Sequence, residues 1–104
     1  LQGMAIDGVK LGSLQIRLKY KLKDVGPGTA PLEKPSAMVH FYDDQRRVIA
    51  EPILGGWFET DDWTTVTKTI PVPQKARELI FRIGLNGATG TLWVDDVSLT
   101  PLER

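Results

Sequence analysis

The sequence predicts an all-β fold in which two antiparallel sheets pack face to face as a sandwich. Leu14–Lys23 alternates apolar and polar side chains over ten residues without a lapse, which is typical of a strand with one buried face. Other short apolar segments are separated by loops rich in glycine and proline, and no helical apolar period persists over ten residues. The length of 104 residues suits one domain, which we assign to residues 1–104.

The first part of the chain contains three expected strands, each bounded by turn-forming residues. They are Met4–Val9, Leu14–Lys23 and Ala37–Asp43, with a proline- and glycine-rich loop at 26–35 before the third. Val48–Ala50 is too short to assign from its pattern. We expect Pro52–Asp62, which holds Gly55 and Gly56, to be a long connection.

The second part contains three more expected strands. Trp63–Ile70 is rich in threonine and β-branched residues, and the prolines that follow should end it. Gln74–Glu78 has the composition of one helical turn. Leu79–Leu85 and Thr91–Leu99 alternate as strands, joined by a turn at 86–90. With the short segments, this predicts six to eight strands.

Composition excludes several classes of function. Thirteen basic and thirteen acidic side chains cancel, so we expect no general attraction to nucleic acid or to membranes. The sequence has no cysteine, and no apolar run approaches the roughly 20 residues that span a bilayer. Because the chain begins at Leu1 without an initiator methionine or a signal peptide, we expect it to derive from a longer protein.

Catalysis is disfavoured by the inventory of reactive side chains. His40 is the only histidine, so it cannot build a multi-histidine metal site, and no serine lies in a Gly-x-Ser-x-Gly context. Glycoside hydrolysis needs two carboxyl groups roughly 5–10 Å apart across a cleft. The carboxylate pairs here are sequence neighbours, at 43–44, 61–62 and 95–96. We therefore expect a protein that is not an enzyme.

The order of segments resembles that of a known group of modules. Trp63 opens a threonine-rich strand, Leu79–Ile83 follows, and a glycine-rich turn leads into Leu92-Trp93-Val94-Asp95-Asp96-Val97-Ser98-Leu99. This order is similar to that of the carbohydrate-binding modules of families four, nine and twenty-two, which are attached to bacterial glycoside hydrolases. The resemblance implies a jelly-roll, galactose-binding-like sandwich and a secreted or periplasmic location.

The resemblance also implies how the strands divide between the sheets. It places Met4–Val9, Trp63–Ile70 and Thr91–Leu99 in one sheet, and the other three long strands in the second. Such modules have further N-terminal strands that this chain lacks, beside Thr91–Leu99 and Leu79–Leu85. We therefore expect both sheets to have an uncovered edge, which a second copy of the chain, a partner or a neighbouring domain would cover.

Asp95 and Asp96 are adjacent on the last expected strand. Neighbours on a strand point to opposite faces, and an unpaired buried carboxylate is costly, so at least one must lie in a polar environment. In the resembling modules, an aspartate of this motif binds a structural calcium ion with oxygens from the N-terminal segment. The alternative is that Asp96 accepts backbone hydrogen bonds at the sheet rim while Asp95 is solvated.

The family analogy places a glycan on the open face of the sheet that contains Leu14–Lys23. The outward side chains expected there are Gln15, Arg17, Lys19, Lys21, Met38, His40, Tyr42, Ile80 and Arg82. This set is basic and has no carboxylate, which favours an acidic glycan because arginine binds carboxylates with two parallel hydrogen bonds. The alternative is an ordinary solvated face whose lysines discourage aggregation.

The three tryptophans receive different assignments. Trp57, beside Gly55 and Gly56, is the best candidate for an exposed platform on which a sugar stacks, and its alternative is a plug over the end of the sandwich. We expect Trp63 to pack in the core or at the rim, and Trp93 to pack in the core.

The sequence thus predicts a non-catalytic module that binds a polysaccharide or oligosaccharide as an accessory of a glycoside hydrolase. The predicted contact residues are Gln15, Arg17, Lys19, His40, Tyr42, Trp57 and Arg82, with Asp95 and Asp96 as the metal candidates. The alternative from another class is a structural or interaction sandwich that has no glycan ligand.

Overall fold

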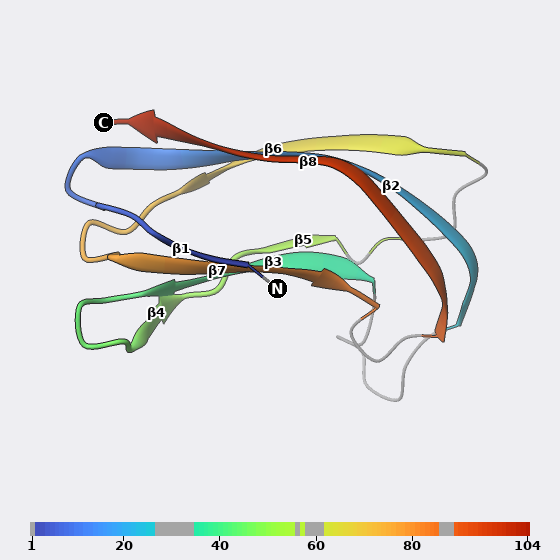
Figure 1. Cartoon of the computed structure of the whole chain (residues 1–104), viewed down its shortest axis with the longest axis horizontal. Helices are drawn as coiled ribbons and strands as arrows, with labels where there is room; N and C mark the ends of the chain where they lie inside the picture. The colour runs from blue at the N-terminus through green and yellow to red at the C-terminus, as the bar shows by residue number, and fades with distance from the viewer. Residues whose placement is uncertain (1, 27–34, 56, 58–61, 86–88) are drawn as a thin grey trace.

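The computed structural model describes residues 2–26, 35–55, 57, 62–85 and 89–104. Most of the expected loop at 26–35 and of the expected turn at 86–90 lies outside these residues, and residues 89 and 90 of that turn belong to a strand. Within the described residues, two antiparallel sheets of five and three strands stack face to face, with no helix (Figure 1). The five-stranded sheet contains β1 (Gln2–Ala5), β7 (Glu78–Gly84), β3 (Ser36–Tyr42), β4 (Val48–Ala50) and β5 (Ile53–Gly55). The three-stranded sheet contains β6 (Thr64–Pro71), β2 (Leu11–Gly26) and β8 (Thr89–Glu103). The predicted all-β sandwich is confirmed.

The expected division of strands between the sheets is wrong for the first two strands. β2 lies between β6 and β8, and β1 pairs with β7 from Gln2 opposite Phe81 to Ala5 opposite Glu78. The chain passes from one sheet to the other in the turn after β1, where the Asp7 carbonyl accepts the N–H groups of Lys10 and Leu11. The long alternating strand β2 can pair with two long neighbours, whereas the short β1 completes the edge of the other sheet.

Two smaller expectations also fail. Gln74 and Lys75 form a turn closed by a hydrogen bond from the Ala76 N–H to the Pro73 carbonyl, no residue of Gln74–Glu78 is helical, and Glu78 already belongs to β7. The expected connection over Pro52–Asp62 contains β5, which pairs with β3 through Leu54 opposite Ala37. Leu54 is buried, so burial of one apolar side chain favours a strand in a segment that is otherwise typical of a loop.

The core forms between the sheets, and β2 supplies its centre. The alternating apolar residues of β2 are all buried, as the period-2 pattern predicts. They are Leu14, Ile16, Leu18, Tyr20 and Leu22. Phe41 and Leu79 of the opposite sheet are fully buried and belong to the same cluster. At the far end of β2, Trp57 stacks on Tyr20 with ring centroids 4.2 Å apart and an interplanar angle of 10°.

Of the two free sheet edges that we expected, at the strands now labelled β8 and β7, the structure has only the one at β8. In the described part of the chain, β8 pairs only with β2, so its outer edge is free as expected. β7 is flanked by both β1 and β3, so the expected free edge at β7 is wrong.

At the other edge of the three-stranded sheet, Lys68 of β6 is exposed although it lies opposite the buried Ile16. A charge on the core side of an edge strand disfavours pairing with a further strand.

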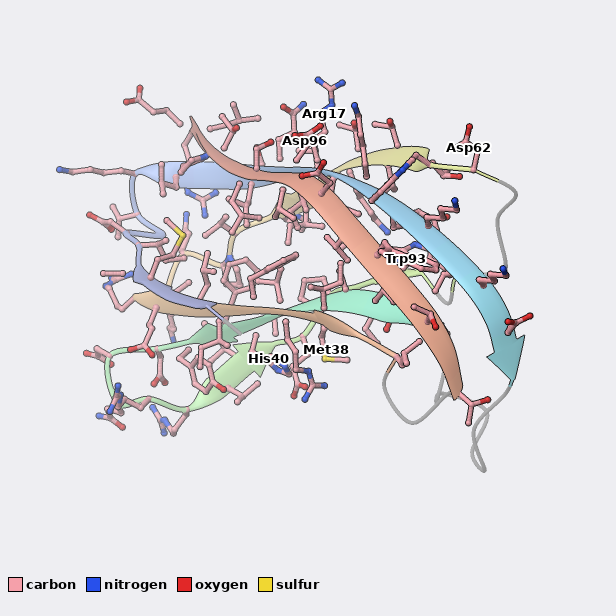
Figure 2. The ribbon with its side chains drawn as sticks, turned by 45° about the vertical axis from the view of Figure 1, so that its right-hand side comes forward. Arg17, Met38, His40, Asp62, Trp93 and Asp96 are labelled. Atoms are coloured by element: carbon pink, nitrogen blue, oxygen red, sulfur yellow. The ribbon has the colours of Figure 1, made fainter. Side chains whose placement is uncertain are left out.

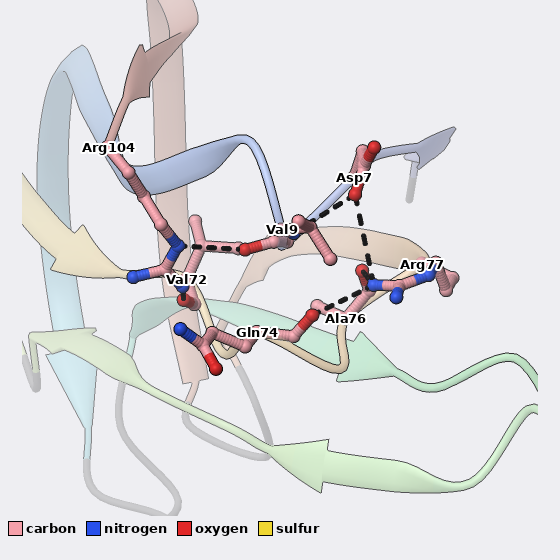
Figure 3. Close-up of polar contacts among 8 residues, drawn as sticks. Asp7, Val9, Val72, Gln74, Ala76, Arg77 and Arg104 are labelled. Atoms are coloured by element: carbon pink, nitrogen blue, oxygen red, sulfur yellow. Dashed lines mark hydrogen bonds and ion pairs between the residues drawn. The ribbon is translucent and has the colours of Figure 1, made fainter.

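One end of the sandwich is held together by two arginines (Figure 3). Arg104 donates from Nε to the Gly8 carbonyl at 2.9 Å and from Nη2 to the Val72 carbonyl at 2.8 Å. Arg77 donates from Nη1 to the carbonyls of Gln74 and Ala76, and that nitrogen is 4.0 Å from Asp7 Oδ1. These bonds join the end of β8 to the β1–β2 turn and the β6–β7 loop.

Asp43 organises the turn after β3 and should give the fold an acid-sensitive component. Its Oδ1 accepts the N–H groups of Arg47 and Gln45, both at 2.9 Å, and its Oδ2 accepts Arg47 Nε at 3.0 Å. The backbone hydrogen bond from Arg47, with the other bonds to the carboxylate, lowers the pKa of Asp43 below its ordinary value of 3.8. The ionised form therefore stabilises the folded state above that ordinary value.

We expect this stabilisation to be lost as the pH falls from 3.8 through the lowered pKa of Asp43. Urea unfolding at a series of acidic pH values should show a steeper loss of stability for the wild type than for Asp43→Asn. Asp44→Asn, at the exposed neighbouring position, is the matched control and should keep the wild-type profile. Parallel profiles for the wild type and Asp43→Asn would contradict this assignment.

Candidate functional site

The outer face of the three-stranded sheet carries polar side chains in rows that cross its strands. The registers of β2 with β6 and with β8 define each row as one residue from each strand. In order along β2, the rows are Thr65–Lys19–Asp95, Thr67–Arg17–Ser98 and Thr69–Gln15–Thr100. One step further along β2, Lys21 lies opposite Trp93. The rows therefore combine threonines from β6, the polar residues of β2, and Asp95, Ser98 and Thr100 from β8 on a single surface, which we call the outer face.

A β-bulge explains how β8 accommodates two adjacent aspartates. Asp95 lies opposite Lys19 and Ser98 opposite Arg17, so two residues of β8 face the single Leu18 of β2. Asp96 lies in the left-handed region with φ of 52°, and its N–H donates to Asp95 Oδ1 at 2.8 Å. Both aspartates are exposed. The expectation that at least one lies in a polar environment is confirmed, because the bulge brings both carboxylates to the outer face.

Asp96 forms an ion pair with Lys19, whose Nζ is 3.2 Å from Asp96 Oδ2. The two side chains are 42% and 63% exposed, so the pair contributes little to stability. The ion pair instead determines where the Lys19 ammonium group lies, because it holds this group beside β8. The expectation that this face has no carboxylate is wrong, since the bulged β8 strand supplies two.

Trp63, which we expected in the core or at the rim, and Trp93, which we expected in the core, both have large exposed fractions. Trp63 is 45% exposed and Trp93 is 41% exposed. Trp93 lies opposite Lys21 on β2, and the Lys21 ammonium group is 5.7 Å from the centroid of the Trp93 ring. Trp63 directly precedes β6 and lines the same surface as Lys19. The core is filled from β2 and the opposite sheet, so the outward register positions of β6 and β8 leave these indoles at the surface.

Two hollows lie side by side on the outer face. The larger, about 400 Å³, is lined by Lys19, Trp63, Thr65 and Asp95. The smaller, about 220 Å³, is lined by Arg17, Leu18, Lys19, Asp96 and Ser98. Lys19 borders both. An aromatic ring, a guanidinium group, an ammonium group and carboxylates therefore surround two adjoining spaces, each open to solvent.

The predicted contact residues do not form one site. Gln15, Arg17 and Lys19 share the outer face, whereas His40, Tyr42 and Arg82 belong to β3 and β7 in the five-stranded sheet. Figure 2 shows Arg17 and Asp96 on one side of the sandwich, and Met38 and His40 on the other. The reason is the exchange of β1 and β2 between the sheets, which separates β2 from β3 and β7.

The second group of predicted residues contacts its own neighbours. His40 Nδ1 is 3.2 Å from Glu51 Oε2, and Arg82 Nη2 is 3.7 Å from Met38 Sδ. Trp57 is 7% exposed and stacks on Tyr20, so its expected role as an exposed stacking platform is wrong. Its N–H donates to the Pro35 carbonyl at 2.8 Å, which holds the indole over the end of the core.

The predicted metal role of Asp95 and Asp96 stays a prediction, and two observations bear on it. Calcium takes six to eight oxygen ligands. In the part of the chain that the structure describes, no group of three or more histidine, cysteine, aspartate or glutamate side chains is suited to hold a metal. Asp96 instead has the Lys19 ammonium group as its cation. Among the same residues, no helix is long and apolar enough to cross a membrane.

Sequence reasoning missed Trp63, Trp93 and Asp95 as members of one surface, although a pattern was present. Alternate residues of a strand share one face. By this rule one face of the segment holds Trp63, Thr65, Thr67 and Thr69, and the other holds Val66 and Ile70. Threonine hydroxyls favour the solvated face, so Trp63 belongs with them. In the same way, Trp93 shares its parity with Thr91 and Asp95.

Comparison with known proteins supports the architecture. A scan against models of protein families gives no match, and a search of curated proteins gives no significant match. A solved structure described as "CBM4 structure and function", a family four carbohydrate-binding module, matches with a probability of 1.00 and a TM-score of 0.59 at 20% identity. The match covers 97% of this chain and 59% of that structure. The expected jelly-roll sandwich of this type of module is confirmed as the fold.

Proposed function

We propose that this jelly-roll domain is a non-catalytic carbohydrate-binding module whose glycan lies on the outer face of the three-stranded sheet. The observation that carries the proposal is the pair of exposed indoles, Trp63 and Trp93, on a surface that also holds two hollows and a row of charged groups. An exposed aromatic surface with polar neighbours suits a ligand that is apolar on one face and polar at its rim.

A sugar ring has this character. Its C–H face packs on an indole, with a contribution on the order of 0.5–1.5 kcal/mol for each aromatic face. Its hydroxyl groups donate to Asp95 and accept from Lys19, Thr65 or Gln15, all of which border the same surface. The binding is an equilibrium without covalent change. The only histidine, His40, pairs with Glu51 on the opposite sheet, far from this surface.

The charge of the outer face favours an acidic glycan. Arg17, Lys19, Lys21 and Lys23 alternate along β2, against Asp95 and Asp96 of β8. Asp96 is occupied by Lys19, and the remaining cations form a field that attracts carboxylate or sulfate groups. As an accessory of a glycoside hydrolase, secreted or periplasmic, the module would keep its enzyme close to such a polymer.

Affinity electrophoresis in gels that contain a soluble polysaccharide tests the proposal. The probes are hyaluronate, polygalacturonate and a neutral xylan. We expect retention on at least one acidic polymer, and a loss of affinity of about 2- to 13-fold for each of Trp63→Ala and Trp93→Ala, from the stacking contribution. Tyr42→Ala, which removes an aromatic ring from the opposite sheet, is the matched control and should leave retention unchanged.

Two outcomes contradict the proposal. Loss of retention in Tyr42→Ala but not in the tryptophan variants would move the glycan to the five-stranded sheet. Retention of the wild type on none of the polymers would favour the alternative, a structural or interaction sandwich without a glycan ligand.

A further inference from the structure

The two hollows on the outer face differ in charge, and this difference carries an inference about the order of sugars in the ligand. It rests on the proposed function. The larger hollow combines the Trp63 indole and the Thr65 hydroxyl with Asp95. The smaller hollow contains Arg17 and Ser98 with Asp96. Lys19 separates the two, so a ligand that fills both must pass over this residue.

The carboxylate of the larger hollow disfavours an anion there. Among the residues that the structure describes, Asp95 makes no ion pair, and its Oδ1 accepts only the N–H of Asp96. The Lys19 ammonium group is directed to Asp96 at 3.2 Å instead. A sugar carboxylate or sulfate stacked on Trp63 would therefore face a like charge, whereas a neutral hydroxyl would donate to Asp95.

The smaller hollow has the opposite preference. Its carboxylate, Asp96, is already neutralised by Lys19. Arg17 makes no ion pair in the described part of the chain, and its row neighbours Thr67 and Ser98 are hydroxyl residues. An exposed guanidinium group without a carboxylate partner can hold an anionic group with two parallel hydrogen bonds.

We propose that the outer face recognises a two-sugar unit of fixed order, with a neutral sugar stacked on Trp63 next to an acidic sugar held by Arg17. The ligand class is therefore a glycan in which neutral and acidic sugars alternate, in preference to a homopolymer of uronic acid. Asp95 excludes the acidic sugar from the tryptophan hollow, and Arg17 selects it in the adjoining one. The minimal ligand is a disaccharide.

The test compares three polymers: hyaluronate, whose acidic and neutral sugars alternate, its carboxyl-reduced form, and polygalacturonate, a homopolymer of uronic acid. We expect the wild type to bind hyaluronate at least tenfold more tightly than either of the others, as one charge-assisted contact predicts. Arg17→Gln should lower the affinity for hyaluronate to that of the carboxyl-reduced polymer. Trp63→Ala should weaken the binding of hyaluronate and of its carboxyl-reduced form by the same factor.

Asp95→Asn provides the sharpest variant, because it removes the repulsion and keeps the shape of the side chain. We expect it to strengthen the binding of polygalacturonate several-fold, with hyaluronate little changed. Lys75→Gln, a charge-matched change in the exposed β6–β7 loop, should affect none of the three polymers. The preference for hyaluronate over its reduced form should also decline at high salt, because exposed charges are screened.

Failure of this inference differs from failure of the proposed function. Equal binding of polygalacturonate and hyaluronate by the wild type overturns the fixed order while retaining carbohydrate binding. The same conclusion follows if Arg17→Gln weakens the acidic and reduced polymers alike, or if Asp95→Asn leaves polygalacturonate unchanged. Absence of binding to every polymer, neutral xylan included, overturns both proposals. All of these variants change exposed side chains, and their melting temperatures verify that they fold.

Discussion

Replacement of Trp57 by alanine should lower the free energy of unfolding by about 3–5 kcal/mol, the usual cost of removing a buried tryptophan. The indole is 7% exposed and stacks on Tyr20, so its loss opens a cavity above the end of β2 and exposes the phenol ring to water. A domain of this size has a total stability of about 5–15 kcal/mol. The variant should therefore be close to unfolding at moderate temperature.

Urea unfolding followed by tryptophan fluorescence and by circular dichroism measures this loss. Trp63→Ala is the matched control, because it removes the same side chain from a position that is 45% exposed. We expect the control to change stability by no more than about 0.5 kcal/mol, as is usual for surface positions. An equal loss of unfolding free energy in Trp57→Ala and Trp63→Ala would contradict a stabilising role for the burial of Trp57.

Gly8→Ala should have the second-largest effect, through a collision of backbone atoms. A Cβ atom at Gly8 would lie 2.1 Å from the carbonyl oxygen of Pro73 and 2.9 Å from that of Gln74. The Gly8 N–H donates to the Ala76 carbonyl at 3.0 Å, and the Gly8 carbonyl accepts Arg104 Nε. Neither segment can retreat without breaking these bonds, so we expect a loss of about 1–3 kcal/mol or more.

Gly84→Ala is the control for this substitution, because a Cβ atom there meets nothing within 4 Å. It also lies in a strand, where alanine reduces the freedom of the unfolded chain. We expect it to be neutral or slightly stabilising. The melting temperatures of the two variants and the wild type test this prediction. A Gly8→Ala protein as stable as Gly84→Ala would contradict it and show that the β1–β2 turn shifts readily.

The sequence was sufficient to place the long strands and the core face of β2, because alternation is a local property. Leu14, Ile16, Leu18, Tyr20 and Leu22 are buried as their spacing predicts. Sheet membership is a property of distant partners. Nothing within Met4–Val9 distinguishes pairing with β7 from pairing with β8, so the exchange of β1 and β2 could not be predicted from those residues.

The site was less predictable for two physical reasons. The bulge at Asp96 depends on the register with β2, and strict alternation over Thr91–Leu99 cannot reveal it. The glycines next to Trp57 are typical of an exposed loop, yet the indole packs on Tyr20, which is 37 positions earlier in the chain (57 − 20). Trp63 was accessible to sequence reasoning, because its parity with Thr65, Thr67 and Thr69 marks it as outward.

The bulge in β8 has a consequence for how such a domain can diversify. Leu92 before it and Leu99 after it both pack against the core, so the interior pattern resumes in phase on either side of the extra residue. Loss of the one extra residue at that point would restore regular alternation and leave both flanks in phase, whereas loss of a residue within the regular part of the strand would turn every following side chain over. Evolution can therefore alter the chemistry displayed at this position while the hydrophobic interior is inherited intact.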